Sequence, residues 1–371
     1  MRILFTCLFF SILFKLTVAQ NYSGPESVEY DYAQQRYLIS NTGSHQIIAL
    51  KNGVKTVFAT LTGSGPHGIE IVGDTLYCCN GTKITALLLS NGSVVYSKTM
   101  GSGFLNGITH DPSGNLFVTD FSAKKIYRLN TYTRNFNVFV ANTTSTPNGI
   151  CYDAFDGITP RLVMCNWGSN ASIKKVSLQD SSISVLTTIS LSNCDGICKG
   201  KSGKFYVSSW GNQSIQRFDS TFTSAPIAVV TNLSNPADIF YNLLSDTLAT
   251  PNASNNTVVF HYQGTTNGLY PVTTSPTFQL SYKPGDSVIT ILTENSESVI
   301  VRILNIQMQE IYFAKTISNN RNRIEVDLAN YPAGTYFVKL NESRALWAVI
   351  RSRFVENSRF LHKKAVSFLK D

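Results

Sequence analysis

Six short phrases of similar pattern carry the polar side chains of this chain that could do chemistry. Each phrase reads polar, small, aliphatic, and its polar position is occupied in turn by Glu26, His67, Asn106, Asn148, Asp195 and Ala237. Carboxylate and amide oxygens are hard ligands of the kind that hold Ca²⁺ or Mg²⁺. If the fold brings the phrases together, their oxygen-bearing members make a candidate metal site: Glu26, Asn106, Asn148 and Asp195. A bound ion would offset the cost of burying two carboxylates, while Ala237 leaves one side of the ring open.

The spacing of the phrases indicates which elements position them. They recur at intervals of 41, 39, 42, 47 and 42 residues. A period near 42 with four short strand signals per unit is typical of a β-propeller, in which each blade supplies one inner strand to a central channel. In the third unit, alternating strand patterns follow the phrase at 116–118, 125–129 and 136–140, and no sustained helical periodicity appears. We therefore predict an all-β fold with a six-bladed β-propeller over residues 21–268, whose polar positions surround the channel mouth.

The remainder of the chain divides into three further segments. Residues 1–20 carry a basic start, an apolar run and a small-residue exit, which predicts a cleaved signal peptide and no transmembrane anchor in the mature chain. Residues 275–353 lose the period but keep five strand signals, which predicts a small C-terminal β-sandwich. Residues 354–371 form a basic tail. The sixth unit lacks a clear outer strand, so the sequence does not predict how the ring closes.

Charge and cysteine content bound the partners and the compartment. The formal net charge of +8 includes Arg2 and Lys15, so the cleaved chain carries +6. We expect a solvated tail and no nucleic-acid partner, because no aromatic stacking series accompanies the basic residues. Six cysteines remain after cleavage, and an exported protein meets oxidising conditions. Cys151 and Cys198 each lie three residues after a ring residue, and could form a disulfide between neighbouring blades or stay as small buried hydrophobes.

Aromatic residues accompany the polar ring. Trp167 and Trp210 follow the second strand of adjacent units, where they could form a binding wall on one face or serve packing. With His67 they are candidate contacts at the channel rim. Asp120, Asn166 and Ser209 end the second strands, and we expect them to cap turns. A serine hydrolase is not indicated, because no Gly-x-Ser-x-Gly elbow is present.

The C-terminal segment contains three distinctive stretches, at 303–309, 324–328 and above all 331–340, which reads Tyr-Pro-Ala-Gly-Thr-Tyr-Phe-Val-Lys-Leu. Through these stretches it resembles the type A sorting domain of the type IX secretion system. The resemblance implies an interaction with that secretion machinery. It also implies that the protein is secreted or attached to the outer cell surface.

The propeller segment resembles the gluconolactonase, senescence-marker and paraoxonase-like superfamily, which is related to NHL repeats. Glu26 in Pro-Glu-Ser, Asn148 in Pro-Asn-Gly and Asp195 in Asp-Gly match, in type and blade order, the positions that hold a divalent cation in its lactonases. The resemblance implies a divalent cation, with calcium the best match, and Asn106 as a fourth contributor. It further implies a metal-dependent lactonase or ester hydrolase in which Asp195 is both ligand and catalytic general base.

One departure from that superfamily keeps a second function open. Its lactonases carry a substrate-holding arginine just before the third-blade glycine, whereas residues 103–106 here read Gly-Phe-Leu-Asn. This argues against sugar-acid lactones. The alternative is a non-catalytic, NHL-like propeller that binds a peptide, protein or glycan at the cell surface.

Overall fold

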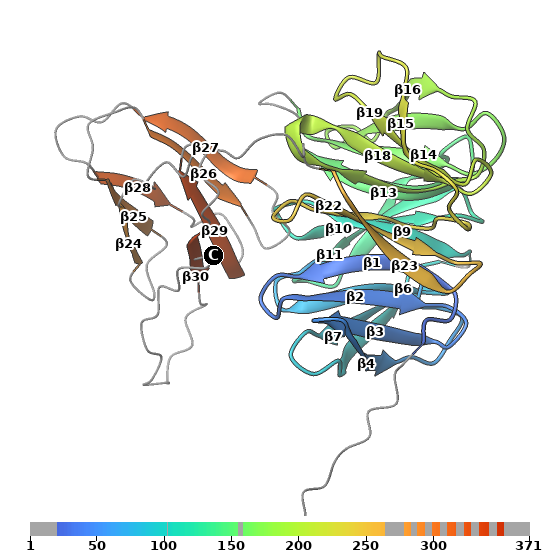
Figure 1. Ribbon diagram of the computed structural model, residues 1–371, viewed down its shortest axis with the longest axis horizontal. Helices are drawn as coiled ribbons and strands as arrows, with labels where there is room; N and C mark the ends of the chain where they lie inside the picture. Colours follow the sequence, from blue (N-terminus) through green and yellow to red (C-terminus); the bar gives the residue numbers. More distant parts are fainter. Residues whose placement is uncertain are drawn as a thin grey trace, which may run out of the picture.

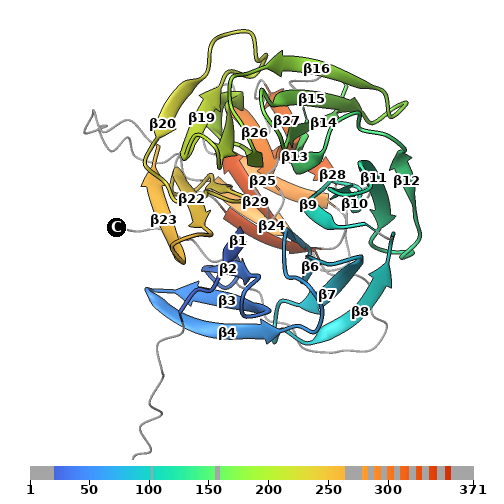
Figure 2. The ribbon, with the colours of Figure 1, turned by 90° about the vertical axis from the view of Figure 1, so that its right-hand side faces the viewer.

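The computed structural model describes residues 21–101, 103–154 and 159–263, and seven strands between residues 278 and 351. The predicted signal peptide and basic tail lie outside the described residues. Figure 1 shows the propeller from the side, and Figure 2 views its blades around their common centre. No helix in the described part of the chain is long and apolar enough to cross a membrane.

The first three blades are four-stranded antiparallel sheets in simple sequence order. Their strands are β1 (Pro25–Asp31), β2 (Arg36–Asn41), β3 (Gln46–Lys51) and β4 (Val54–Thr60); β5 (Ile69–Val72), β6 (Thr75–Asn80), β7 (Lys83–Leu88) and β8 (Val94–Thr99); β9 (Leu105–His110), β10 (Asn115–Asp120), β11 (Lys125–Asn130) and β12 (Phe136–Val140). The middle strands are buried and the outer strands are half-exposed, because only the inner and middle strands face two neighbouring blades.

The last three blades keep this order, but the sixth has only three strands among the described residues. Their strands are β13 (Pro147–Asp153), β14 (Arg161–Asn166), β15 (Ser172–Ser177) and β16 (Ile183–Thr188); β17 (Cys194–Lys199), β18 (Phe205–Ser209), β19 (Ser214–Phe218) and β20 (Ile227–Val230); β21 (Phe240–Asn242), β22 (Thr247–Asn252) and β23 (Thr257–Tyr262). Strands β4, β8, β12, β16, β20 and β23 form the periphery in Figure 2. The predicted six-bladed propeller is confirmed.

The ring closes by packing of the sixth blade against the first. One apolar cluster joins Val28, Ile39 and Ile48 of the first blade to Ala249 of β22, just as five other clusters join the remaining neighbours. The backbone N–H of Asp238 also donates to the carbonyl of Glu26 at 2.8 Å. Burial of apolar surface between blades therefore holds the two ends of the propeller together without an exchanged strand among the described residues.

Glycine follows the ring residue in four of the six phrases because the inner strands nearly touch there. A Cβ on Gly149 would lie 2.5 Å from the carbonyl oxygen of Asp195, and one on Gly196 would lie 2.6 Å from the Cα of Asp238. No side chain fits into such an approach without moving the backbone. The recurring polar-glycine pair is thus a packing requirement of the channel mouth.

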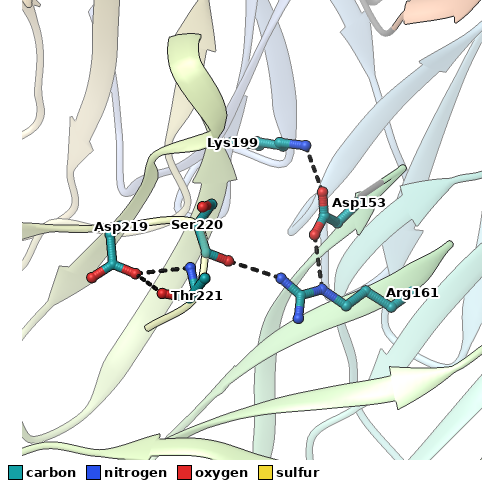
Figure 3. Close-up of polar contacts among 6 residues, drawn as sticks. All are labelled: Asp153, Arg161, Lys199, Asp219, Ser220 and Thr221. Atoms are coloured by element: carbon teal, nitrogen blue, oxygen red, sulfur yellow. Dashed lines mark hydrogen bonds and ion pairs between the residues drawn. The ribbon is translucent and has the colours of Figure 1, made fainter. Parts of the chain in front are cut away.

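An ion-paired clamp ties the fourth blade to the fifth (Figure 3). The fully buried carboxylate of Asp153, at the end of β13, accepts bonds from Arg161 Nε at 2.8 Å and from Lys199 Nζ at 2.5 Å. Arg161 Nη2 also donates to the carbonyl of Ser220 at 3.1 Å. Asp219 fixes that turn by accepting bonds from the backbone N–H and hydroxyl of Thr221.

The same clamp recurs between the first two blades. Asp31, at the end of β1, accepts a bond from Arg36 Nε at 3.0 Å, and Arg36 Nη2 donates to the carbonyl of Leu89 in the second blade. A carboxylate at the end of an inner strand and an arginine at the start of the next strand thus join neighbouring blades twice.

The C-terminal strands form two antiparallel sheets. One has the order β24 (Phe278–Tyr282), β25 (Val288–Thr293), β28 (Arg323–Asp327); the other has the order β27 (Glu310–Thr316), β26 (Val299–Leu304), β29 (Gly334–Leu340), β30 (Trp347–Arg351). Val301, Ile303, Val326 and Val338 are buried. The strand content agrees with the prediction, while the packing of the two sheets into a sandwich and the domain boundaries at 268, 275 and 353 stay predictions.

Replacing the clamp arginine tests its contribution to stability. Arg161→Met leaves the buried Asp153 with Lys199 alone, so we expect a loss of about 1.5–3 kcal/mol in the free energy of unfolding. Chemical denaturation measures it. Arg128→Met, which changes an exposed arginine of β11, is the control and should leave the midpoint unchanged; equal shifts in both variants would show that the clamp stabilises nothing.

Candidate functional site

The ring residues lie at one end of the inner strands. Glu26, Asn106, Asn148 and Asp195 are each the second residue of their strand, in β1, β9, β13 and β17. The register of each strand with its neighbour shifts immediately beyond them. Such a bulge re-aims a side chain, and in these four blades it lies at the ring position. His67 precedes β5 at the same level of the second blade.

Amide side chains link three of the blades at the mouth. Asn106 Nδ2 donates to Asn148 Oδ1 at 2.5 Å, and Asn148 Nδ2 donates to the carbonyl of Cys194 at 3.3 Å. Cys194 is the residue before Asp195, so the two amides span the third to the fifth blade. Both side chains are buried, and their orientations are fixed by these bonds.

The sixth blade contributes a carboxylate that the sequence analysis missed. Ala237 occupies the ring position, but Asp238 stands where the other blades have glycine or serine. Its Oδ2 accepts a bond from the hydroxyl of Ser27 at 2.7 Å. The side that Ala237 was expected to leave open therefore carries a negative group one residue later. A comparison of the second residue of the six phrases, which is glycine or serine in the other five, would have revealed this aspartate.

Burial, together with the charges of neighbouring carboxylates, raises the pKa values of the acids at the mouth. Burial, and then the charge of Asp238, raise the pKa of Glu26 to about 7. Burial raises the pKa of Asp238 to about 7 as well, partly opposed by the hydroxyl of Ser27. The pKa of Asp195 is raised well above its usual range by burial and by the charges of Glu26 and Asp238, partly opposed by Asn148 and Trp210.

A second polar layer lies further along the channel. Glu29 and Glu70 stand three residues after Glu26 and His67, and both are buried. His110 Nδ1 lies 2.5 Å from Glu70 Oε1. Burial and the neighbouring Glu70 raise the pKa of Glu29. The channel is thus lined with acidic groups at two levels.

Five aromatic residues form a continuous series on the mouth face, which we call the aromatic arc. Ring centroids are separated by 4.5 Å for His67 and Phe104, 5.8 Å for Phe104 and Phe121, 5.9 Å for Phe121 and Trp167, and 5.4 Å for Trp167 and Trp210. Successive rings meet edge to face, and all five are half-buried. Burial lowers the pKa of His67 to about 4, so its imidazole is neutral at pH 7. The sequence predicted Trp167, Trp210 and His67 at the rim, but not the two phenylalanines that connect them.

The residues that end the second strands cap the loops that carry the arc. Asp120 Oδ1 accepts bonds from the backbone N–H groups of Phe104, at 3.0 Å, and Ala123, at 2.8 Å. Asn166 Nδ2 donates to the carbonyl of Ser172, and Ser209 Oγ donates to the carbonyl of Ser192. The predicted capping role of these three residues is confirmed.

A buried lysine supports the loop that leads to Asn148. Lys174 Nζ donates to the carbonyl of Thr143 and to the hydroxyls of Thr144 and Ser145, at 2.7–2.8 Å. Thr144 has a φ of +63°, which is unusual for a β-branched residue. Ser145 in turn donates to Asn166 Oδ1, so the ammonium fixes this loop against β14. Burial lowers the pKa of Lys174.

The carboxylate and amide oxygens at the mouth suit a hard cation, although they are not already arranged at metal-ligand spacing. Within the described residues, no three carboxylate, imidazole or thiol groups come together at metal-ligand spacing. The two ring carboxylates are instead accompanied by amide oxygens and by Asp238, and no lysine or arginine of the described part forms an ion pair with them. A divalent cation would relieve the repulsion that raises their pKa values. All six cysteines that follow the predicted signal peptide are free thiols, so Cys151 and Cys198 form no disulfide.

Comparisons with known proteins assign the C-terminal segment and the fold. Residues 283–350 match the family model of the secretion system C-terminal sorting domain, which confirms that prediction. Such a domain marks the chain for export to the medium or cell surface, and implies an interaction with the secretion machinery. No curated protein matches the chain.

Several solved propellers are similar to this chain in fold. A regucalcin from Agrobacterium tumefaciens, described as a calcium-binding protein, has 17% identity and a TM-score of 0.53, covering 64% of this chain and 84% of its own. A nidogen/laminin complex has 16% identity and a TM-score of 0.51, covering 58% and 86%. A virginiamycin B lyase from Staphylococcus aureus has 16% identity and a TM-score of 0.49, covering 74% and 94%. At these identities the likeness to the regucalcin and to the nidogen/laminin complex establishes the propeller fold alone.

The pH dependence of stability tests the charge accumulation at the mouth. Because the folded-state pKa of Asp238 is raised from 3.8 to about 7, the folded protein holds more protons than the unfolded chain between about pH 4 and 7, and stability falls as pH rises through that window. Asp238→Asn should therefore be more stable than the wild type at pH 8 by several degrees, with the advantage shrinking toward pH 4.

This difference is measured by thermal unfolding in chelator, from pH 4 to pH 8. His67 has a lowered pKa and acts in the opposite direction, but it is common to both proteins and cancels in the difference. A variant that is less stable than the wild type by the same amount at every pH would contradict the account.

Proposed function

We propose that the channel mouth binds a divalent cation, with calcium the best match to its donors, on Glu26, Asn148 and Asp195, and with Asn106 as a fourth contributor. The observation that carries the proposal is that the acidic side chains of the first, fifth and sixth blades lie near enough at the mouth to raise one another's pKa values, beside linked amide side chains. Carboxylate and amide oxygens are the ligands that calcium prefers. The similarity in fold to a calcium-binding protein supports the choice of metal.

We further propose that this site hydrolyses a lactone or ester. A bound cation would polarise the substrate carbonyl and favour the ionised form of the carboxylates around it. Asp195 then serves as general base: it takes a proton from the water that attacks the carbonyl carbon, and returns it to the alcohol oxygen as the C–O bond of the lactone or ester breaks. Asn106 and Asn148 orient the reacting groups through their fixed amides. The orienting bond from Asn106 to Asn148 is short and buried.

A second candidate function is favoured by the aromatic arc. Residues 103–106 supply no arginine, and the face carries five half-buried rings instead. An exported propeller with such a face also suits a non-catalytic role, in which it binds a glycan, peptide or protein outside the cell.

Cation binding is tested by thermal unfolding in the presence of calcium. A ligand that binds only the folded state stabilises it by about 2.7 kcal/mol at a hundredfold excess over Kd. We expect added Ca²⁺ to raise the Tm of the wild type by several degrees, and chelator to reverse the shift. Glu26→Gln and Asp195→Asn should lose most of the response.

Asp180→Asn is the matched control, because Asp180 is an exposed acid on a hairpin turn of the fourth blade. If it responds to calcium no better than Asp195→Asn, or if the wild type does not respond at all, the cation site is wrong.

Turnover is tested with a panel of lactones and aryl esters. Asp195→Asn should lower kcat by roughly 10²–10⁴-fold, the usual contribution of a general base, and chelator should abolish wild-type activity. Hydrolysis that survives both changes would come from another site. A wild type that binds calcium but hydrolyses nothing in the panel would favour the second candidate function.

A further inference from the structure

We propose that the aromatic arc is a saccharide platform, on which a pyranose unit of a neutral glycan stacks its C–H face while its hydroxyls bond to the oxygens of the mouth. This inference rests on the second candidate function, because it requires that the mouth face binds a ligand, and it adds the chemical class of that ligand. It does not require turnover.

The fold does not need aromatic residues at these positions. The residue that follows the second strand is aromatic in the third, fourth and fifth blades, but small in the other three: Phe121, Trp167 and Trp210 against Thr42, Gly81 and Ala253. Half of the blades close the same turn with a small side chain, so packing of the turn does not explain the large ones. Three large, half-exposed aromatic residues on adjacent blades are typical of an interaction surface.

The arc is rigid before any ligand arrives. The backbone N–H of Phe121 donates to the carbonyl of Phe104 at 2.8 Å, that of Trp167 to Thr146 at 3.0 Å, and that of Trp210 to Asn193 at 3.0 Å. Each ring also rests against the edge or face of the next. Little conformational entropy remains to be lost on binding, which favours a platform for a weakly binding ligand.

The chemistry beside the arc favours a hydroxyl-rich ligand. The mouth offers oxygen acceptors to a ligand in the partly exposed carboxylates of Glu26 and Asp238, whereas Asp195, Asn106 and Asn148 are buried. Aromatic faces require an apolar surface opposite them, and oxygen acceptors require donors. A pyranose ring presents both, with C–H bonds on its faces and hydroxyls on its rim. The small residues of the first, second and sixth blades leave the opposite side of the mouth free of large side chains at these turns.

A ligand with a positive charge is the main competitor, because aromatic rings and carboxylates also bind ammonium groups. Tetramethylammonium, which carries a positive charge and no hydroxyl, therefore serves as the competing probe.

Isothermal titration of the full chain with neutral hexasaccharides tests the proposal. The probes are cellohexaose, xylohexaose, laminarihexaose and mannohexaose, each in calcium and in chelator. We expect at least one to bind the wild type, and Trp210→Ala and Phe121→Thr to weaken it by at least about tenfold. These substitutions introduce residues that the fold already accepts at the same turn of the sixth and first blades. Trp167→Phe should retain most of the affinity.

The control is Tyr262→Ala, which removes an aromatic side chain that is 60% exposed on β23, and it should bind as the wild type does. If no hexasaccharide binds the folded wild type in either buffer, or if binding survives the arc variants, the proposal is overturned. Arc-dependent binding of tetramethylammonium without saccharide binding would overturn it in favour of a cationic ligand. Failure of the cation site would appear instead in the calcium response of Glu26→Gln and Asp195→Asn, which leave the arc intact.

Discussion

The close approach of the inner strands at the channel mouth is the constraint on which the rest of the structure depends. At Gly149 and Gly196 the backbone of one blade meets the backbone of the next, with no room for a side chain. The residue before each glycine is then the first position whose side chain can extend toward the axis. Steric convergence therefore creates a ring of adjacent side chains, and the sequence fills it with carboxylates, amides and one imidazole.

Concentrating acids around an axis has an electrostatic cost that the fold does not offset by itself. The clamps that join blades pair each buried carboxylate with an arginine, as Asp153 does with Arg161. Glu26 and Asp195 have no such partner among the described residues, and their pKa values rise instead. Buried carboxylates without a basic partner are typical of functional sites, where a ligand can supply the positive charge. The aromatic arc then gives the same face an apolar side.

The features that repeat along the chain could be predicted from the sequence. The contacts between blades, and the positions where one unit departs from the repeat, could not. The 42-residue period, the strand alternation and the polar-glycine pairs repeat, so each unit supports the interpretation of the others. Asp238 was missed because the sixth blade carries its acid at the position where four other blades have glycine, and its bond to Ser27 joins residues far apart in the sequence. Phe104 and Phe121 lie in different loops. These loops meet through the bond from the Phe121 N–H to the Phe104 carbonyl and through the bond that Asp120 accepts from the Phe104 N–H. Closure by Val28 and Ala249 joins residues more than two hundred positions apart, with no local signal.

Proton release on calcium binding tests the central claim most directly. If the cation binds to carboxylates whose pKa values are raised to about 7, binding must displace protons at neutral pH, because ligands coordinate in the deprotonated form. Calorimetric titration with Ca²⁺ at pH 7, in buffers of different ionisation enthalpy, counts them. The account predicts a single site with net proton release that is lost in Asp195→Asn. Binding without proton release, or release unchanged in that variant, would contradict it.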